Sequence, residues 1–335
     1  MPVAHRMRGA LALSLMALLC AAAKPAPMLI DRQGSFTVGG TVIGDAAKSL
    51  HCDHGFVEYQ IPAHPRKTAL FLWHSASVQA WQQRWDGGEG YQSLFLRRGF
   101  PVYLWDGPRV GRANWACEPY NVTPRIGTDQ MNFMAWRFGT ADGAWFPGVQ
   151  FPKTDPQALD QAMRARYDEF DTTPNALLQG GAAAKAIDRI GPSVLVTNSA
   201  GGLRALVAAT KSDQVKAIVA YETPAFVFPE GEGPKGSTGP IDSIRVPMAD
   251  FMKLTRIPIQ IVWGDNTEKT FWRGSVALTR QFVDLVNAHG GHAEILMLPD
   301  VGIHGNTHIA FADLNNVQVA DQLSLFLKKN KLDLR

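Results

Sequence analysis

Apolar runs alternate with amphipathic stretches along most of the chain. Thr68–Trp73 (TALFLW) and Ser193–Thr197 (SVLVT) have polar residues only at their ends, as is typical of strands covered on both faces. Phe271–Ala288 instead spaces its apolar residues as one face of a helix does. Because apolar strands alternate with helices, the pattern predicts the α/β class, with a mostly parallel central sheet and helices on both faces.

The other predicted elements follow the same two periodicities. Ser35–Val42 and Phe56–Ile61 alternate polar with apolar residues and predict an antiparallel opening pair. Further strands are expected at Pro101–Trp105, Val215–Tyr221, Ile257–Trp263 and Ala293–Leu298, and further helices at Tyr91–Arg98, Gly201–Lys211 and Val317–Lys329. A chain of 335 residues with 46% apolar content can bury one large core, so we expect a single domain over residues 24–335.

Two segments interrupt this alternation. Residues 107–190 separate two strands that about 20 residues could join, and they are rich in tryptophan and phenylalanine. We expect a partly helical cap insertion lined with aromatic side chains, although these rings could equally pack a small core of the insertion itself. Residues 223–250 contain the run PEGEGPKGSTGP, which predicts a mobile loop insertion.

Residues 1–23 have the layout of a secretory signal peptide. Arg6 and Arg8 precede an apolar run over residues 10–19, and small residues follow at Ala21–Ala23. The apolar run is too short to span a bilayer as a permanent helix. We therefore expect the mature protein to be secreted or periplasmic, without a stable membrane anchor.

The charge balance argues against nucleic acid as a partner. The whole chain carries 33 basic and 30 acidic residues, a formal net charge of +3. Without the signal peptide, which holds two arginines and no acid, 31 basic and 30 acidic residues remain. Nucleic-acid-binding proteins usually show a basic footprint, and a body with a net charge of +1 gives no sign of one.

Cys52 and Cys117 are the cysteines left after the signal peptide, with Cys20, is removed. In an oxidising compartment we expect the two to form a disulfide, the alternative being two buried free thiols. Neither has a CxxC neighbour, which argues against a zinc site.

The most informative stretch is NSAGG, which directly follows the predicted strand at 193–197. A strand that ends in a serine on a tight turn before a helix is typical of a nucleophile elbow. The residues flanking Ser199 must be small, which Gly201 satisfies, while Thr197 stands where glycine is usual. The start of the helix aims the Ala200 amide at the place where an oxyanion would form. The alternative is an ordinary strand-to-helix turn that Ser199 caps.

The loop after the strand at 68–73 is where this architecture supplies a second oxyanion amide. It reads His74-Ser75-Ala76-Ser77, and small residues here let the backbone approach a substrate. Ala76 is the candidate donor. We expect His74 to fix the loop by hydrogen bonding rather than to act as a base.

The general base should be an imidazole, because its pKa lies near neutral pH. It should follow the last strand, and the loop before the final helix holds both His304 and His308. We favour His308 as the base that reaches Ser199, with His304 as a residue that fixes the loop.

The acid that orients the imidazole has two candidate positions, and the chain order Ser, acid, His holds for both. One follows the strand at 257–263, where Asp265 and Glu268 lie, although Thr267 occupies the usual position. The other is Glu222, at the carboxyl end of the strand that follows the nucleophile, where sites form in parallel sheets. We favour Glu222, with Asp265 as the alternative acid or else as a turn residue.

With these residues in place, the chain resembles a serine esterase of the α/β-hydrolase superfamily, and more narrowly the bacterial secreted esterase 713-like group. The resemblance covers most of the mature chain. It is carried by Gly39-Gly40, His74, Phe95–Tyr103, Asp106–Arg112, Gly264-Asp265-Asn266, Gly305–His308 and Leu314-Asn315-Asn316. In that group the acid is a glutamate after the strand that follows the nucleophile, which implies Glu222, and the histidine carried over is His308.

Two positions depart from the pattern of that group. Its type member has neighbouring, bridged cysteines in the oxyanion loop, where this chain has Ala76 and Ser77. Its elbow reads closer to His-Ser-x-Gly, whereas Asn198 precedes Ser199 here. Both changes bear on substrate range rather than on the class of reaction.

The residues and the resemblance together predict a secreted serine hydrolase that cleaves a carboxylic ester through an acyl-serine intermediate, without a metal or cofactor. The aromatic insertion indicates a small-molecule substrate that is apolar or aromatic. The sequence leaves the oligomeric state open, with a homodimer as one option. Alternatives are a lactonase, amidase or polyester hydrolase with the same triad, or a non-catalytic binding protein of the same fold.

Overall fold

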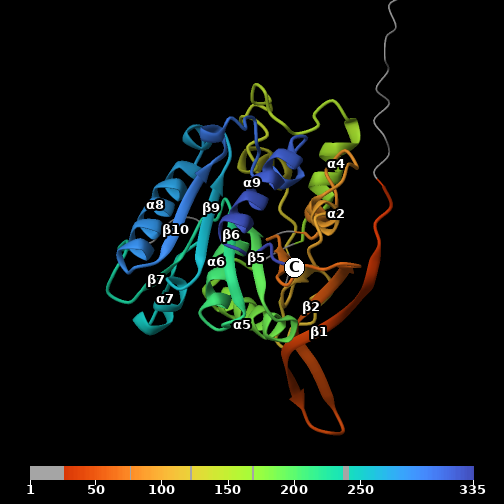
Figure 1. Ribbon diagram of the computed structural model, residues 1–335, viewed down its shortest axis with the longest axis vertical. Coiled ribbons are helices and arrows are strands. Elements are labelled where there is room, and N and C mark those ends of the chain that lie inside the picture. The colour runs from red at the N-terminus through yellow and green to blue at the C-terminus, as the bar shows by residue number, and fades with distance from the viewer. Residues whose placement is uncertain (1–25, 76, 121–122, 168–169, 237–240) are drawn as a thin grey trace, which may run out of the picture.

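The computed structural model describes residues 26–75, 77–120, 123–167, 170–236 and 241–335 (Figure 1). The predicted signal peptide over residues 1–23 and the candidate oxyanion donor Ala76 lie outside the described residues.

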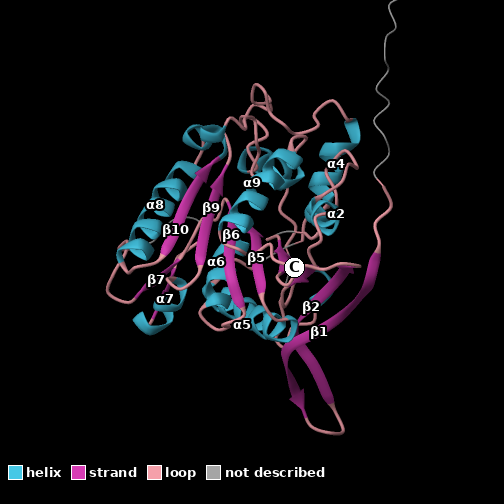
Figure 2. Cartoon of the chain, viewed as in Figure 1, coloured by secondary structure: helices cyan, strands magenta, loops and turns pink. Residues whose placement is uncertain are grey.

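The centre of the molecule is an eight-stranded sheet, whose strands β10, β9, β6 and β5 lie side by side in Figure 2. Its strand order is β1-β2-β4-β3-β5-β6-β9-β10. The pairs β1–β2 and β2–β4 are antiparallel and all other neighbours are parallel, which confirms the predicted mostly parallel sheet with an antiparallel opening pair. The strands are β1 Ile30–Gly44, β2 Ser49–Pro62, β3 Ala69–Trp73, β4 Val102–Asp106, β5 Ser193–Asn198, β6 Val215–Tyr221, β9 Pro258–Trp263 and β10 His292–Met297.

Helices cover both faces of this sheet. The helices of the described residues are α1 Gln79–Gln82, α2 Tyr91–Arg97, α3 Thr128–Ala135, α4 Pro156–Arg164, α5 Thr173–Ile190, α6 Ala200–Ala209, α7 Met248–Leu254, α8 Trp272–Ala288 and α9 Asn316–Lys329. Short 3₁₀ turns lie at Gly111–Ala113, Thr267–Lys269, Leu298–Val301 and Ala310–Ala312. No helix in the described part of the chain is long and apolar enough to cross a membrane.

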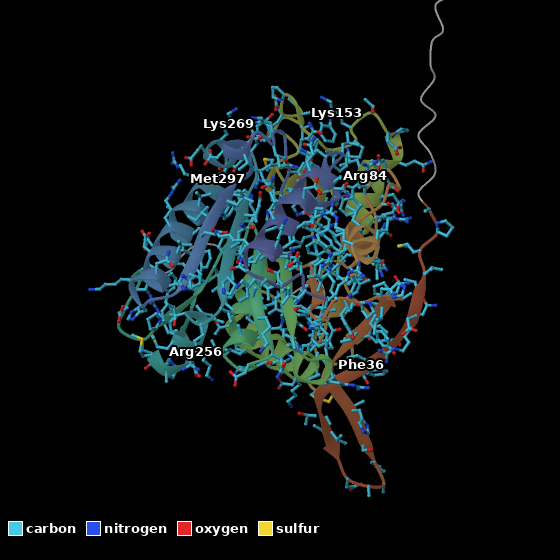
Figure 3. The ribbon with its side chains drawn as sticks, in the orientation of Figure 1. Phe36, Arg84, Lys153, Arg256, Lys269 and Met297 are labelled. Atoms are coloured by element: carbon cyan, nitrogen blue, oxygen red, sulfur yellow. A yellow bond between two sulfur atoms is a disulfide. The ribbon has the colours of Figure 1, made fainter. Side chains whose placement is uncertain are left out.

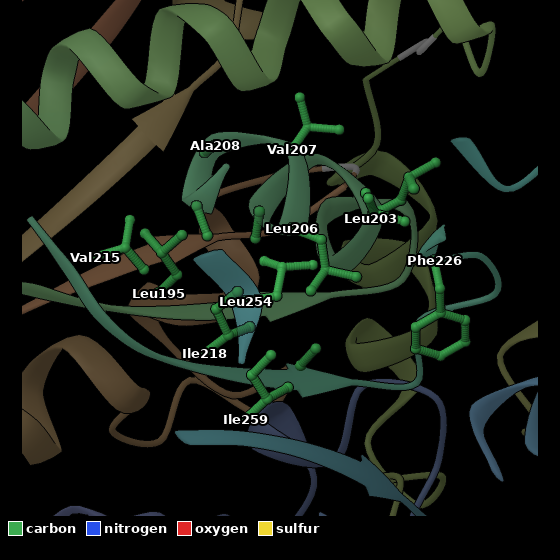
Figure 4. Packing of buried hydrophobic residues seen from close by; sticks show 14 of the residues in the cluster. Leu195, Leu203, Leu206, Val207, Ala208, Val215, Ile218, Phe226, Leu254 and Ile259 are labelled. Atoms are coloured by element: carbon green, nitrogen blue, oxygen red, sulfur yellow. The ribbon is translucent and has the colours of Figure 1, made fainter. Parts of the chain in front are cut away.

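The core has two halves because side chains alternate across each strand. Phe71 and Trp73 of β3 face the layer of α5, α6, α7 and α8, whereas Leu70 and Leu72 face α2, α9 and the aromatic insertion. Figure 4 shows part of the first half, which includes Leu206 of α6 and Ile218 of β6. Burial on both faces explains the apolar interior of β3, whereas β6 and β9 each contain one polar residue, Lys216 and Gln260.

The β1–β2 hairpin extends beyond the body of the molecule (Figure 1). Its root packs on α5, where Arg189 places its guanidinium 4.0 Å from the ring of Phe36 (Figure 3). At Gly40 the backbone has φ +79°, and a Cβ there would lie 2.5 Å from the carbonyl oxygen of Cys52. Glycine is therefore required at this point of the hairpin.

A disulfide ties this hairpin to the segment that follows β4. Cys52 and Cys117 are bonded, which confirms the predicted pair and excludes two free thiols. Beside it, Asp53 accepts two hydrogen bonds from Arg109, at 2.8 and 2.9 Å, and its amide donates to the carbonyl of Trp115 at 2.7 Å. The covalent bond and the ion pair together fix the start of the insertion against β2.

Parts of the two interrupting segments belong to the body of the fold. The last part of residues 107–190 is α5, which belongs to the helical layer over the sheet and not to a cap. Residues 223–250, expected as a loop, contain the buried parallel strands β7 (Val227–Pro229) and β8 (Ile244–Val246) and the start of α7. Both pieces bury apolar side chains in the first half of the core.

The aromatic side chains of the insertion pack against one another. The ring centroids of Phe138 and Phe151 are 4.2 Å apart, and Trp145 stacks on Phe151 at 5.3 Å. Phe133 meets Trp145 edge-on at 4.9 Å. These rings belong to the second half of the core. They agree with the alternative expectation, in which the aromatic residues of the insertion pack a core rather than line a cap.

The disulfide should contribute substantially to stability. It closes a loop across a sequence separation of 65 residues, for which chain entropy gives about 4 kcal/mol. Reduction, or the Cys52→Ser variant, should therefore lower the denaturant midpoint in urea unfolding followed by circular dichroism. The double variant Cys52→Ser/Cys117→Ser is the control and should not respond to reductant; equal midpoints for the oxidised and reduced wild type would contradict the prediction.

Candidate active site

Ser199 and Glu222 follow two neighbouring parallel strands at the same edge of the sheet. Ser199 comes directly after β5 and Glu222 directly after β6, and Asn198 pairs with Tyr221 in the register of these strands. Both Ser199 and Glu222 have φ +55°. Left-handed backbone at a non-glycine residue costs on the order of 1–3 kcal/mol and gathers at functional sites. The strained serine at a strand-to-helix turn is the geometry predicted for a nucleophile elbow.

The small residues after Ser199 are required by close packing. A Cβ at Gly201 would lie 2.9 Å from the carbonyl oxygen of Trp73, and one at Gly202 would lie 2.4 Å from the Cβ of Thr223. Thr197, which replaces the usual glycine, lies at an ordinary 3.7 Å from the same point above Gly201. The tight contact in this elbow is therefore with the end of β3, and a threonine fits on the other side.

Of the two candidate oxyanion donors, Ala200 lies within the described residues. Ala200 is buried as the first residue of α6, so its amide belongs to the positive end of that helix. Of the other loop, His74 is buried and its Nδ1 accepts a hydrogen bond from the amide of Ser77 at 3.0 Å. Burial lowers the pKa of His74 to about 3, and the nearby His308 adds to the effect. A neutral ring that accepts from the loop backbone agrees with the predicted loop-fixing role.

The side chains of His308 and Glu222 are joined by a hydrogen bond. Nδ1 of His308 lies 2.7 Å from Oε2 of Glu222, and both groups are buried. Glu222 also accepts from the amide of Gly264 at 2.8 Å. Both of its oxygens accept hydrogen bonds from the guanidinium of Arg137, whose own side chain is 0% exposed. The buried carboxylate thus accepts hydrogen bonds from an imidazole, a backbone amide and a guanidinium.

These contacts set the charge states of the pair. Burial raises the pKa of Glu222, but the attraction of Arg137 and the hydrogen bond from His308 outweigh it and hold the pKa below its ordinary 4.5. Burial lowers the pKa of His308 below 6.5, and Glu222 opposes that shift while Arg137 adds to it. At neutral pH the site therefore holds a carboxylate and a neutral imidazole, which is the state needed in a general base.

The imidazole of His308 is held by its ring and by its backbone. Trp272 stacks on it with ring centroids 4.4 Å apart and planes 22° from parallel. The amide of His308 donates to the carbonyl of Trp136 at 2.8 Å, and its carbonyl accepts from Nδ2 of Asn198 at 2.9 Å. Asn198, which departs from the family pattern, also donates to the carbonyl of Tyr221 at 3.3 Å. This one amide links the strand before Ser199 to the strand before Glu222 and to the histidine loop.

The loop that carries His308 is built around a buried carboxylate. Asp313 accepts from the amide of Thr307 at 2.8 Å, from its hydroxyl at 2.9 Å and from Nδ2 of Asn306 at 3.1 Å. Burial raises the pKa of Asp313 to about 7 in spite of these bonds. Gly305 opens the loop with φ +80°, where a Cβ would lie 2.0 Å from the carbonyl oxygen of Gly148.

Asp265 and His304, the other candidates from the sequence, lie together at a different place. Asp265 accepts a hydrogen bond from the amide of Gly305, and its carboxylate is 3.8 Å from Nδ1 of His304. Its backbone carbonyl accepts from Nε of Arg137 at 2.7 Å. The side chain of His304 is 67% exposed. The side chain of Asp265 braces the histidine loop, whereas Nδ1 of His308 donates its hydrogen bond to Glu222.

Sequence reasoning missed Arg137, Trp272 and the bridging role of Asn198. An arginine in a run of aromatic residues (MAWRF) is a weak signal of a buried ion pair, because arginines are mostly exposed. The sequence contained no indication that Arg137 reaches Glu222, 85 residues further on. Within the described residues, no group of three or more His, Cys, Asp or Glu side chains could hold a metal ion.

The sheet order, the elbow after β5 and the buried His–Glu pair define a protein of the α/β-hydrolase fold. The solved structure of a novel bacterial esterase superimposes with a TM-score of 0.76 at 25% identity, covering 91% of this chain and 98% of that one. A fungal protein described as a probable secreted lipase (Fungal sp., strain ATCC 74256) is 24% identical over 328 residues, covering 82% of this chain and 85% of its own. No family model matches the chain.

The depressed pKa of His74 predicts acid sensitivity of the fold. The unfolded chain binds a proton at this residue below its ordinary pKa of 6.5, but the folded chain binds it only near pH 3. Between these values the unfolded state is favoured as pH falls, by up to about 1.4 kcal/mol per pH unit for this one proton. Urea unfolding from pH 7 to pH 4 should therefore show a shallower loss of stability in His74→Asn than in the wild type. The exposed His64→Asn serves as control, and identical slopes for His74→Asn and the wild type would contradict the assignment.

Proposed function

We propose that this protein is a serine esterase that acts outside the cytoplasm and cleaves a carboxylic ester with a Ser199–His308–Glu222 triad. The observation that carries the proposal is the buried hydrogen bond between Nδ1 of His308 and Glu222, formed at the strand end next to the strained Ser199. A carboxylate on Nδ1 fixes the tautomer that leaves Nε2 as the proton acceptor.

In the proposed mechanism, Oγ of Ser199 attacks the ester carbonyl while Nε2 of His308 takes its proton. Glu222 stabilises the imidazolium that forms. The carbonyl oxygen becomes negative and binds the Ala200 amide at the start of α6, together with the Ala76 amide expected from the sequence. Each such donor is worth about 3 kcal/mol in the transition state. The protonated His308 then protonates the leaving alcohol, and water hydrolyses the acyl-serine with the same imidazole as base.

The substrate class is supported by the relatives. The two similar proteins are named as an esterase and a secreted lipase, which favours an ester over a lactone or an amide. The insertion's rings pack against one another, so they no longer argue for an aromatic substrate. We expect a small-molecule ester with an apolar acyl or alcohol part, because the two similar proteins are named as an esterase and a lipase.

Export from the cytoplasm is supported by three independent features. The first 23 residues read as a signal peptide. The Cys52–Cys117 disulfide is typical of an oxidising compartment. The fungal relative is itself described as secreted.

Replacing the nucleophile should abolish hydrolysis without unfolding the protein. In Ser199→Ala the rate of p-nitrophenyl ester cleavage should fall by on the order of 10⁴–10⁶, and a fluorophosphonate probe should no longer label the protein. Ser49→Ala, on the exposed hairpin, is the matched control and should keep both the ester cleavage and the labelling by the probe. Full activity of Ser199→Ala would eliminate the mechanism, and a wild type that is neither active nor labelled would favour a binding protein.

The two acid candidates can be separated by isosteric variants. Glu222→Gln removes the negative charge that supports the imidazolium, so kcat should fall by about 10³–10⁴. Asp265→Asn should lower kcat far less, since Asp265 contacts Gly305 and His304 of the histidine loop and not the imidazole of His308. Steady-state kinetics at pH 8 compares the two, with circular dichroism as a check of folding. A larger loss in Asp265→Asn would reassign the acid.

A further inference from the structure

Three consecutive residues of the insertion each bind a different part of the candidate site. The carbonyl of Ala135 accepts from Nε1 of Trp272 at 2.6 Å, and Trp272 in turn stacks on His308. The carbonyl of Trp136 accepts from the amide of His308 at 2.8 Å. The side chain of Arg137 binds both carboxylate oxygens of Glu222. We call Ala135–Arg137 the clamp segment.

The clamp segment joins parts of the chain that come from four different places. Glu222 follows β6, Asp265 follows β9, Trp272 begins α8, and His308 lies in the loop before α9. Arg137 bonds the first two at once, because its Nε donates to the carbonyl of Asp265 at 2.7 Å while its two terminal nitrogens bind Glu222. Its rigid planar group therefore fixes the orientation of the Glu222 carboxylate relative to the end of β9.

Burying the charge of Arg137 costs free energy, so we ask which role of the charge offsets this cost. Its side chain is 0% exposed and its backbone has φ +57°, which is unfavourable for a residue with a Cβ. A buried ion pair gives little net stability compared with apolar residues of the same size. A fixed cation here does have an electrostatic effect, because without it burial would favour the protonated form of Glu222.

We propose that Arg137 is a positioning residue for the catalytic acid: it holds Glu222 ionised and aligned with Nδ1 of His308, and thereby makes docking of the insertion a condition for a working triad. This inference rests on the proposed function. Arg137 does not touch the reacting atoms, and it acts through Glu222.

Three charged or titratable groups bear on the His308–Glu222 pair. Arg137 contacts Glu222 directly and repels a proton on His308. His74 lies near enough to His308 for their charges to interact, and Asp313 interacts with Glu222 through space. Removing the Arg137 cation raises the proton affinity of the pair, whichever of its two members takes the proton.

The test compares Arg137→Met, Arg137→Lys and the exposed control Arg164→Met, whose side chain is 75% exposed. In Arg137→Met, kcat for p-nitrophenyl ester cleavage should fall by about 10² with KM nearly unchanged, and the acid limb of kcat/KM should move to higher pH. Arg137→Lys keeps the charge but not the paired geometry, so its acid limb should stay close to that of the wild type while kcat recovers only in part. Arg164→Met should match the wild type in both measurements.

A second measurement does not depend on activity. In the Ser199→Ala background, the proton NMR titration of His308 should move to higher pH when Arg137→Met is added. The inference would be overturned if Arg137→Met lowered the thermal unfolding temperature but moved neither the His308 titration nor the acid limb of kcat/KM. Arg137 would then be a structural ion-pair residue. If Arg137→Met does not fold, Arg137→Lys decides, and wild-type kcat in that variant would overturn the inference as well. A wild type without ester hydrolysis would end the proposed function, while the NMR comparison would still decide the role of Arg137.

Discussion

The site depends on one buried negative charge and its neutralisation. Glu222 is 1% exposed, and a carboxylate so deep in a protein normally takes up a proton. Here the guanidinium of Arg137, the ring of His308 and the amide of Gly264 converge on it. Because these partners come from distant parts of the chain, the charge becomes stable only when the insertion, the sheet and the histidine loop are assembled. Folding and the preparation of the site for chemistry are in this sense one event.

The sequence predicted the parts of the molecule that depend on local pattern. Apolar runs such as Thr68–Trp73 located the central strands within one or two residues, since burial on both faces leaves an unmistakable composition. The elbow at Ser199 was predicted by the requirement for small residues after a strand. Glu222 and His308, favoured from chain order and resemblance, prove to be hydrogen-bonded to each other.

The parts that sequence could not predict depend on partners distant in the chain. Nothing near Arg137 shows that it pairs with Glu222, because an ion pair leaves no periodic pattern. Asn198 looked like a departure from the family, yet its amide bridges the ends of two strands, which only the strand register reveals. In residues 223–250, glycine and proline obscured the short strands β7 and β8, whose stability comes from packing rather than propensity.

The left-handed backbone at Glu222 has a consequence for how this architecture can change over time. By turning at the end of β6, the chain delivers its acid one strand earlier than the loop after β9 would. That later loop then supplies Glu222 and Arg137 with main-chain groups alone, the amide of Gly264 and the carbonyl of Asp265. Apart from Asp265, whose carboxylate holds the histidine loop, the side chains after β9 are released from proton chemistry, so they can change without loss of the triad.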